Sequence, residues 1–378
     1  MNKIIVLGAG MVGSAMAIDL SAKHKVTIVD INGVAVEKAV SKCNDLDGIV
    51  LDVTDKEKLQ KAIAPFDLVV CAVPGFLGFQ TLKNIIEAGK NVVDISFFAE
   101  NALELDELAK QMNVTAIVDC GVAPGMGNII LGYHDRSLEI EEFLCLVGGL
   151  PKKREWPFEY KAPFSPIDVL EEYTRPARYV ENGSLVVKEA LSDSEFVDFE
   201  NIGTLEAFNT DGLRSLIYTM PHIPNMKEKT LRYPGHIEYI KVLKKAGFFK
   251  NEMINIGGAS LSPMEFTSKI LLDSWKLGEY EEELTVMEIT IKGKDKLTKK
   301  PVEIKYNLYD EYDVKTNTSS MARTTGYTAT AAVNLVLDGL FSEKGIFPPE
   351  LLGNNEICYN FVMKYLNDRG VVYEKVEK

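Results

Sequence analysis

Between Lys3 and Asp119, short apolar runs alternate with stretches whose apolar residues recur at helical spacing. The runs predict strands and the stretches between them predict helices, because each periodicity places apolar side chains on a buried face. The predicted strands are Lys3–Leu7, Lys25–Val29, Gly48–Asp52, Asp67–Val73, Asn91–Ile95 and Val114–Asp119. Strands and helices that alternate in this way form a parallel sheet covered by helices on both faces.

The pattern changes at about Glu139, where strand-like segments become frequent and are no longer separated by regular helices. The predicted strands here are Phe143–Val147, Arg178–Val180, Leu185–Lys188, Glu283–Lys292 and Pro301–Leu308. The last two are expected to pair as a hairpin across the basic turn Lys292–Lys300. The predicted helices are Ile237–Lys245, Pro263–Leu272 and Met321–Leu340. Strands followed by separate helices indicate an α+β domain with a mostly antiparallel sheet.

We therefore predict an α/β protein of two domains. Residues 1–138 and 321–378 form a Rossmann-type, doubly wound parallel sheet with a returning C-terminal segment. Residues 139–320 form an inserted α+β domain for substrate binding and dimerisation. An exposed edge on the second sheet favours a homodimer, since paired edges avoid unwanted association.

A glycine motif lies between the first predicted strand and the first predicted helix. It reads Gly8-Ala9-Gly10-Met11-Val12-Gly13, and the second strand ends at Asp30. Gly8 permits the tight turn, Gly10 lets the backbone approach a pyrophosphate, and Gly13 lets helix and strand pack closely. Asp30 can accept hydrogen bonds from both ribose hydroxyls and would repel a 2′-phosphate, which favours NAD over NADP. The alternative interpretations are a purely structural turn and a solvated strand end.

Further cofactor contacts are expected at the carboxyl ends of the other strands, where ligands of such sheets bind. Asp52 and Val53 are predicted beside the adenine, and Val73 and Pro74 beside the nicotinamide ribose. Asp94 and Ser96, at the end of the fifth strand, complete the predicted cofactor set. Each of these segments could also be an ordinary strand–helix turn.

Composition changes this picture mainly by exclusion. The chain has 378 residues, with 42 Lys and Arg against 55 Asp and Glu, so its net charge is −13. This balance disfavours a nucleic acid or an anionic membrane as a partner. No apolar run reaches the roughly 20 residues of a membrane helix, and the N-terminus leads directly into a strand, so we expect a cytoplasmic protein. The five scattered cysteines indicate neither disulfides nor a zinc site, and no metal is expected.

Arginine and histidine side chains supply the candidates for substrate contact. Guanidinium groups bind carboxylates bidentately, and the candidates are Arg175, Arg178, Arg214, Arg232 and Arg323. For each of them a surface ion pair is the alternative. His222 and His236 could transfer protons, although an isolated histidine can equally be structural. Because no nucleophile motif is present, the chemistry is expected to come from the cofactor.

Several longer motifs resemble the saccharopine dehydrogenase family, nearly from end to end. The motifs are Val6–Gly13 with Asp30, Asn91–Phe98, Val118–Gly125, Val147–Pro151, Glu206–Arg214 and Leu231–His236. The reductases of this family that form saccharopine carry an Asp where Ala123 stands here, and a Cys where Val147 stands. These differences favour another reaction. The resemblance implies NAD-dependent oxidative deamination of a free terminal amine, such as that of L-lysine.

The resemblance also implies roles for individual residues. Asp119, at the end of the last strand, is the first candidate for holding or deprotonating the amine, and His236 is the second. Arg214 and Arg232 are the first candidates for binding the α-carboxylate, with Arg178 after them. Asp119 could instead cap the following turn. A saccharopine- or carboxynorspermidine-type reductase and, more remotely, a non-catalytic NAD-sensing regulator remain the alternatives.

Overall fold

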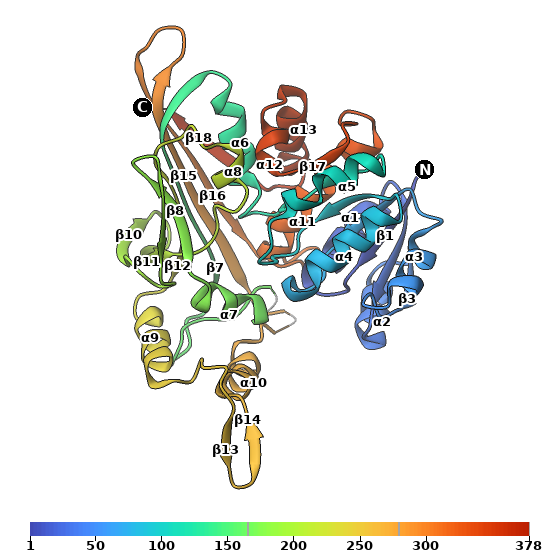
Figure 1. Ribbon diagram of the computed structural model, residues 1–378, viewed down its shortest axis with the longest axis horizontal. Coiled ribbons are helices and arrows are strands. Elements are labelled where there is room, and N and C mark those ends of the chain that lie inside the picture. Colours follow the sequence, from blue (N-terminus) through green and yellow to red (C-terminus); the bar gives the residue numbers. More distant parts are fainter. Residues whose placement is uncertain (165, 279, 378) are drawn as a thin grey trace.

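Two sheets lie side by side in the computed structural model, which describes residues 1–164, 166–278 and 280–377 (Figure 1). The parallel sheet lies on the right of this view and the second, mixed sheet on the left. The prediction of an α/β fold with a second, mostly antiparallel sheet is confirmed.

The parallel sheet has seven strands in the order β17-β6-β5-β4-β1-β2-β3. They are β1 (Lys3–Leu7), β2 (Lys25–Asp30), β3 (Leu46–Val50), β4 (Leu68–Cys71), β5 (Asn91–Asp94), β6 (Thr115–Ile117) and β17 (Gly345–Phe347). All neighbouring pairs run parallel. Six strands lie close to the predicted apolar runs, although β3 begins at Leu46 instead of Gly48. The sequence pattern does not predict β17, because three residues are too few to show a periodicity.

Helices cover both faces of this sheet, and β1 shows the consequence for the sequence. Ile4, Ile5, Val6 and Leu7 are all fully buried. Ile4 and Val6 belong to one apolar core, and Ile5 and Leu7 belong to the core on the opposite face. A strand that is covered on both faces therefore needs apolar residues in succession, without polar alternation.

Polar side chains cap the N-termini of two helices in the first domain, α2 and α3. Asn32 accepts a hydrogen bond from the Val34 amide at the start of α2, and Asp55 accepts one from the Lys58 amide at the start of α3. The helices are α1 (Met11–Ser21), α2 (Gly33–Lys42), α3 (Lys56–Ile63), α4 (Gly75–Glu87), the 3-10 helix η1 (Ala102–Leu105) and α5 (Asp106–Gln111).

The second sheet has nine strands and is antiparallel except where β12 pairs with β7. Its strands are β7 (Leu138–Pro151), β8 (Ala177–Glu181), β9 (Ser184–Lys188), β10 (Glu195–Phe199), β11 (Gly203–Asn209), β12 (Met226–Arg232), β15 (Glu283–Asp295), β16 (Pro301–Glu311) and β18 (Tyr373–Glu377). The predicted hairpin is present as β15 and β16, which pair from Leu284 with Glu311 to Lys294 with Pro301.

Among the residues that the structure describes, five helices and a small arm complete the second region. The helices are α6 (Met126–Asp135), α7 (Pro166–Thr174), α8 (Leu216–Thr219), α9 (His236–Ala246) and α10 (Pro263–Trp275). The arm is a two-stranded hairpin, β13 (Ile254–Ile256) and β14 (Ala259–Leu261), which extends away from the body at the bottom of Figure 1.

After β16 the chain returns to the parallel sheet and then leaves it again. Helix α11 (Ser320–Leu337) packs against α1, and β17 adds an edge strand beside β6. The remaining helices are α12 (Pro349–Gly353) and α13 (Glu356–Asn367). The last strand, β18, then pairs with β16 in the mixed sheet. The division into residues 1–138 with 321–378 and residues 139–320 stays a prediction.

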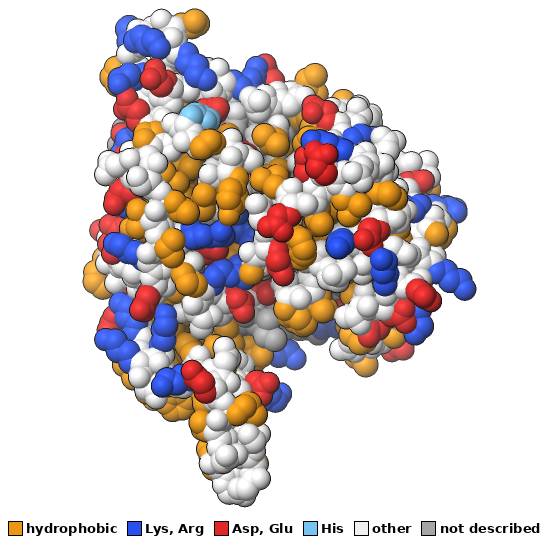
Figure 2. Space-filling model, in the orientation of Figure 1, with side chains coloured by type: hydrophobic (Ala, Val, Ile, Leu, Met, Phe, Trp, Pro, Cys, Tyr) orange, Lys and Arg blue, Asp and Glu red, His pale blue; other side chains and the backbone are white. Residues whose placement is uncertain are grey.

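Charged side chains of both signs are interspersed over the face shown in Figure 2. Within the described residues, every helix is too short or too polar to cross a membrane. The predicted homodimer stays a prediction.

The contact between α6 and α12 allows a test of the packing. A Cβ atom added at Gly132 would lie 2.0 Å from the carbonyl oxygen of Glu350, so the two helix backbones meet where no side chain fits. We expect Gly132→Ala to lower the free energy of unfolding by about 2 kcal/mol, as overpacking does, in spite of the higher helix propensity of alanine. Urea denaturation measures this change.

Gly127→Ala is the matched control in the same helix. A Cβ atom at Gly127 would lie 3.4 Å from Cys145 Sγ, at ordinary contact distance. This variant is expected to be as stable as the parent or slightly more stable. Equal effects of the two substitutions would contradict the close approach of α6 and α12.

Candidate active site

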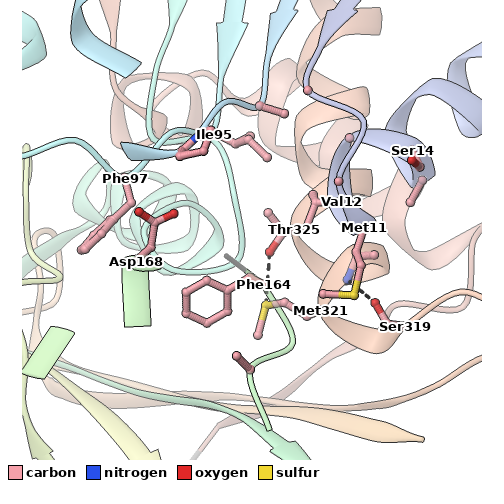
Figure 3. A pocket seen from close by; sticks show the side chains of 18 of the residues that line it. Met11, Val12, Ser14, Ile95, Phe97, Phe164, Asp168, Ser319, Met321 and Thr325 are labelled. Carbon is pink, nitrogen blue, oxygen red and sulfur yellow. Dashed lines mark hydrogen bonds between the residues drawn. The ribbon is translucent and has the colours of Figure 1, made fainter. Parts of the chain in front are cut away.

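A cavity of about 1530 Å³ lies between the two sheets, at the carboxyl ends of β1, β2, β4 and β5. Ligand pockets usually measure about 300–1,000 Å³, so this cavity has room for a dinucleotide and a small substrate together. Figure 3 shows its two ends: Met11, Val12 and Ser14 lie on one side, and Phe97, Phe164 and Asp168 on the other. Met321 and Thr325 of α11 lie between them.

The predicted glycine loop forms one wall of the cavity. Gly8, Gly10, Met11, Val12 and Gly13 all line it. Gly8 has φ +111°, and a Cβ atom at Gly13 would lie 2.0 Å from the Gly8 carbonyl oxygen, so both positions need glycine. The loop leads directly into the N-terminus of α1, where unpaired backbone N–H groups favour phosphate.

Asp30 lies at the end of β2, beside this loop. Its Oδ2 accepts a hydrogen bond from the Ala9 amide at 2.7 Å, and its Oδ1 accepts one from the Asn32 amide at 2.9 Å. These bonds hold the carboxylate at the wall of the cavity, which Asp52 and Val53 also line. The hydroxyl and amide of Thr54 hold the pKa of Asp52 below its usual range. This end therefore offers fixed acceptors to an adenosine ribose.

Val73, Pro74 and Ser96 line the middle of the cavity, as expected, but Asp94 does not. Asp94 is fully buried beneath the wall, where it accepts hydrogen bonds from the Ser96 amide at 2.9 Å and the Ser96 hydroxyl at 3.2 Å. Burial raises its pKa to about 7. Asp94 thus orients Ser96, and the expectation that it contacts the cofactor is not supported by its position.

We call the end of the cavity that is lined by Asp119, Glu172, Glu228 and Arg232 the inner end. Asp119 forms a buried ion pair with Arg214 there. Arg214 Nη2 donates to Asp119 Oδ1 at 2.9 Å, and the two side chains are only 4% and 5% exposed. Arg214 also donates to the carbonyl oxygen of Phe98. Asp119 lines the cavity, whereas Arg214 lies behind it and does not. Its expected contact with a substrate carboxylate therefore does not follow from this position.

Arg178 also lies outside the large cavity. Its guanidinium donates to both carboxylate oxygens of Asp211, at 2.7 and 2.9 Å, and to the hydroxyl of Tyr218. With Arg214 and one side of Asp119, it lines a separate cavity of about 280 Å³. A clamp of Arg178, Arg214 and Arg232 on one carboxylate is thus not what the structure contains.

Arg232 is the one member of the predicted trio that lines the large cavity. It is 2% exposed, and its Nη2 donates to Glu172 at 2.7 Å. Its guanidinium also lies over the ring of Tyr160, 4.4 Å from the centroid. These contacts fix a cation in the cavity wall.

His236 does not line the cavity. Its two ring nitrogens are engaged by the carbonyl oxygen of Phe158 and the hydroxyl of Tyr173, both at 2.9 Å. Burial, and then the charge of Arg232, lower its pKa to about 3. A neutral, enclosed imidazole of this kind cannot reach a substrate, so the structure does not support the expected role of His236 as a base.

The inner end of the cavity instead contains carboxyl groups that the sequence reasoning missed, above all Glu228 of β12. No hydrogen bond or ion pair from another described residue engages Glu228. Burial, and then the nearby carboxylates of Glu172, Asp211 and Asp119, raise its pKa to about 8. The strand carried a usable signal: Glu228, Thr230 and Arg232 alternate along β12 and therefore share one face, and all three are buried.

Two further features define this end. Asp168 of α7 accepts a hydrogen bond from the Gly75 amide at 3.3 Å, which connects the second region to the start of α4 across the cavity. Ala123 and Val147, the two positions where the chain departs from saccharopine-forming reductases, both line the cavity. Within the described residues, no group of three or more His, Cys, Asp or Glu side chains could hold a metal ion.

Comparison with known proteins identifies relatives along the whole chain. A family model described as the saccharopine dehydrogenase NADP binding domain matches residues 4–117, and the saccharopine dehydrogenase C-terminal domain matches residues 118–371. The saccharopine dehydrogenase [NADP(+), L-glutamate-forming] of Saccharomyces cerevisiae is 25% identical, over 99% of this chain and 98% of its own. The carboxyaminopropylagmatine dehydrogenase of a Synechocystis strain is 21% identical, over 93% of this chain and 92% of its own.

A partial relative and a solved structure extend this comparison. The mitochondrial alpha-aminoadipic semialdehyde synthase of Bos taurus is 29% identical over 67% of this chain, which corresponds to 28% of that longer protein. The apo structure of the L-Glu-forming saccharopine dehydrogenase from Saccharomyces cerevisiae superposes with a TM-score of 0.79 at 20% identity and covers both chains fully. The fold is thus shared along the entire chain.

The Asp119–Arg214 pair predicts a measurable effect on stability. Arg214→Met leaves the Asp119 carboxylate buried without a cation, and we expect the free energy of unfolding to fall by about 3–5 kcal/mol in urea denaturation. The double variant Asp119→Asn with Arg214→Met is expected to regain much of this loss, because no isolated charge remains. Arg136→Met, which breaks the exposed pair with Glu356, is the control and should cost about 1 kcal/mol or less. A double variant as unstable as Arg214→Met would contradict this interpretation.

Proposed function

Because the chain belongs to the saccharopine dehydrogenase family, whose named members are oxidoreductases acting on amino acids and related amines, we propose that it oxidises the terminal amine of L-lysine with NAD. Residues 4–117 are its pyridine-nucleotide-binding domain. The observation that carries the substrate proposal is the composition of the inner cavity wall. Asp119, Glu172 and Glu228 lie there with a single guanidinium, that of Arg232.

This balance of charges suits a substrate with one carboxylate and a cationic amine at its far end. Arg232 is the group of opposite charge for the carboxylate, and the carboxyl groups of Glu228 and Asp119 are the acceptors for the ammonium. Saccharopine carries three carboxylates and would need more cations. Ala123 and Val147 leave this part of the wall without the acidic and thiol groups of the saccharopine-forming reductases.

Asp30 supports NAD as the cofactor. Its carboxylate is held at the cavity wall by the Ala9 amide, so a 2′-phosphate placed beside it would meet a fixed negative charge. The similar yeast enzyme is named for NADP, and the proposal therefore departs from that relative on this one residue.

The reaction needs a neutral amine, because a lone pair on nitrogen must assist the departure of hydride from the ε-carbon. A free lysine amine has a pKa of about 10.4, so the cavity must take its proton. Bound NAD would accept the hydride, leaving an imine whose hydrolysis by water gives ammonia and an aldehyde that closes onto the α-amine. Glu228 is suited to receive the ammonium proton, since its carboxyl has no cation partner and its pKa is raised to about 8. Asp119, which forms an ion pair with Arg214, also lines this wall and offers carboxylate oxygens to the ammonium group that binds first.

Saccharopine-type chemistry is the second candidate function, and the end-to-end similarity to the yeast enzyme favours it. A non-catalytic NAD sensor is the third. The three differ in what they do with NAD and an amine, so one assay separates them.

The assay follows NADH absorbance with L-lysine, saccharopine, ornithine and diaminopimelate as donors, with NAD or NADP. We expect turnover with lysine and NAD, with stoichiometric ammonia, and a kcat/KM at least about tenfold lower with NADP, as expected for about 1.4 kcal/mol of charge repulsion. Turnover of saccharopine alone would establish the second candidate. Tight NAD binding without turnover of any donor, from neutral to alkaline pH, would favour the sensor.

The ionisation of Glu228 is expected to determine how kcat/KM for lysine depends on pH. The carboxyl must be ionised to accept a proton, so kcat/KM for lysine should rise with pH up to about 8, where Glu228 loses its own proton. Glu228→Gln should abolish this rise of kcat/KM with pH, which is the acidic limb of the profile. It should also lower kcat by about 10²-fold, the usual contribution of a general base. Glu195→Gln, at an exposed carboxylate on β10, is the control and should keep the profile. An unchanged limb in Glu228→Gln would assign the proton transfer to another group.

A further inference from the structure

Four groups form a buried hydrogen-bonded chain that ends at Arg232. The chain runs from the carbonyl oxygen of Phe158 through His236 and Tyr173 to the Arg232 guanidinium. Arg232 lines the cavity, whereas His236 and Tyr173 do not. All three side chains are almost fully buried, at 2% exposure or less. The conformation of Arg232 therefore depends on residues that no substrate can touch.

The direction of each hydrogen bond in this chain follows from its first member. A carbonyl oxygen can only accept, so Nδ1 of His236 carries the hydrogen that bonds to Phe158. In a neutral imidazole the other nitrogen, Nε2, is then an acceptor, and the Tyr173 hydroxyl donates to it at 2.9 Å. The phenol oxygen is left to accept from Arg232 Nε at 3.0 Å.

The protonation states keep this direction over a wide pH range. The pKa of His236 is lowered to about 3, so the ring is neutral near pH 7 and above. Burial raises the pKa of Tyr173 to about 12, so its hydroxyl keeps the hydrogen that it donates. The chain thus presents one and the same acceptor to Arg232 from acidic to alkaline solution.

The remaining donors of Arg232 are almost all used as well. Nη1 donates to the Leu231 carbonyl oxygen at 2.9 Å. Nη2 donates to Glu172 at 2.7 Å and to Tyr160 at 3.3 Å. A guanidinium has five N–H groups, and these contacts leave one, on Nη1, for a ligand. The plane of the guanidinium decides where that single N–H points.

We propose that Tyr173 and His236 are positioning residues, which hold the guanidinium of Arg232 in the plane that receives the carboxylate of the substrate. This role rests on the proposed function only in requiring a substrate that carries a carboxylate. It differs from proton transfer by His236, because the imidazole acts here through Tyr173 and stays neutral throughout turnover.

Three variants test the hydrogen-bonded chain from Phe158 to Arg232. Tyr173→Phe removes both hydrogen bonds of the hydroxyl with little change in shape. His236→Leu removes the acceptor for the Tyr173 hydroxyl, whereas His236→Gln can offer its amide oxygen in place of Nε2. We expect Tyr173→Phe and His236→Leu to raise KM for the amino acid about tenfold, with kcat within about twofold and KM for NAD unchanged. His236→Gln should restore KM to within about twofold of the parent.

The pH profile separates positioning from catalysis. If His236→Gln lowers kcat as strongly as His236→Leu, and both lose one limb of the profile, His236 transfers protons and the proposal is wrong. Unchanged KM in all three variants would also overturn it. His222→Leu, at a half-exposed histidine paired with Asp135 on the surface, is the control and should leave every constant unchanged. If His236→Leu fails to fold, Tyr173→Phe and His236→Gln still give opposite expected results.

A binding measurement makes this test independent of lysine turnover. Trp275 is fully buried, and its ring lies 5.9 Å from that of His236 and 6.1 Å from that of Tyr173. In a Trp156→Phe background, which removes the exposed second tryptophan, we expect the emission of Trp275 to change when an amino acid binds. If another amino acid is oxidised in place of lysine, the proposal of lysine as the substrate is wrong. The KM and Kd for that amino acid then test the positioning role of Tyr173 and His236. Equal Kd values in the parent and in Tyr173→Phe would then reject the positioning role.

Discussion

The buried ion pair between Asp119 and Arg214 is the interaction on which the arrangement of the cavity depends. Asp119 follows β6 of the parallel sheet, and Arg214 follows β11 of the mixed sheet, so the pair connects the two sheets at the inner end. Both residues have a positive φ, 53° for Asp119 and 50° for Arg214, which is a backbone conformation that residues other than glycine rarely adopt. Arg214 forms its ion pair with Asp119 and none with Glu228, whose pKa is raised by burial and then by the carboxylates of Glu172, Asp211 and Asp119.

The sequence predicts the nucleotide-binding half of the molecule well, because its signals are local. The apolar runs around β1 and β2 and the glycines between them have a required spacing, and the expected side chains apart from Asp94 line the cavity. The inner half depends on tertiary contacts instead. Arg178 forms an ion pair with Asp211, and Arg214 forms one with Asp119. The positions of these residues in the chain do not predict either pair. His236 differs from expectation for the same reason, since its partners Phe158 and Tyr173 are distant in the chain. Asp94 differs because its side chain is fully buried beneath the cavity wall, where it accepts hydrogen bonds from Ser96.

The two ends of the cavity consequently present different chemical groups to a ligand. At the adenosine end, backbone amides and Asp30 provide a general surface for a dinucleotide. At the inner end, the carboxyl groups of Asp119, Glu172 and Glu228 outnumber the one guanidinium that lines the wall, that of Arg232.

The return of the chain to both sheets has a consequence for synthesis on the ribosome. Strand β17 and helix α11, which complete the parallel sheet and cover one of its faces, are translated more than 200 residues after β6. The mixed sheet likewise receives its last strand, β18, at residues 373–377. Neither sheet can therefore reach its final form as an independent N-terminal unit while the chain is growing. A nascent chain stalled before residue 320 should expose the apolar face that α11 later covers, and chaperones that bind such surfaces would recognise it.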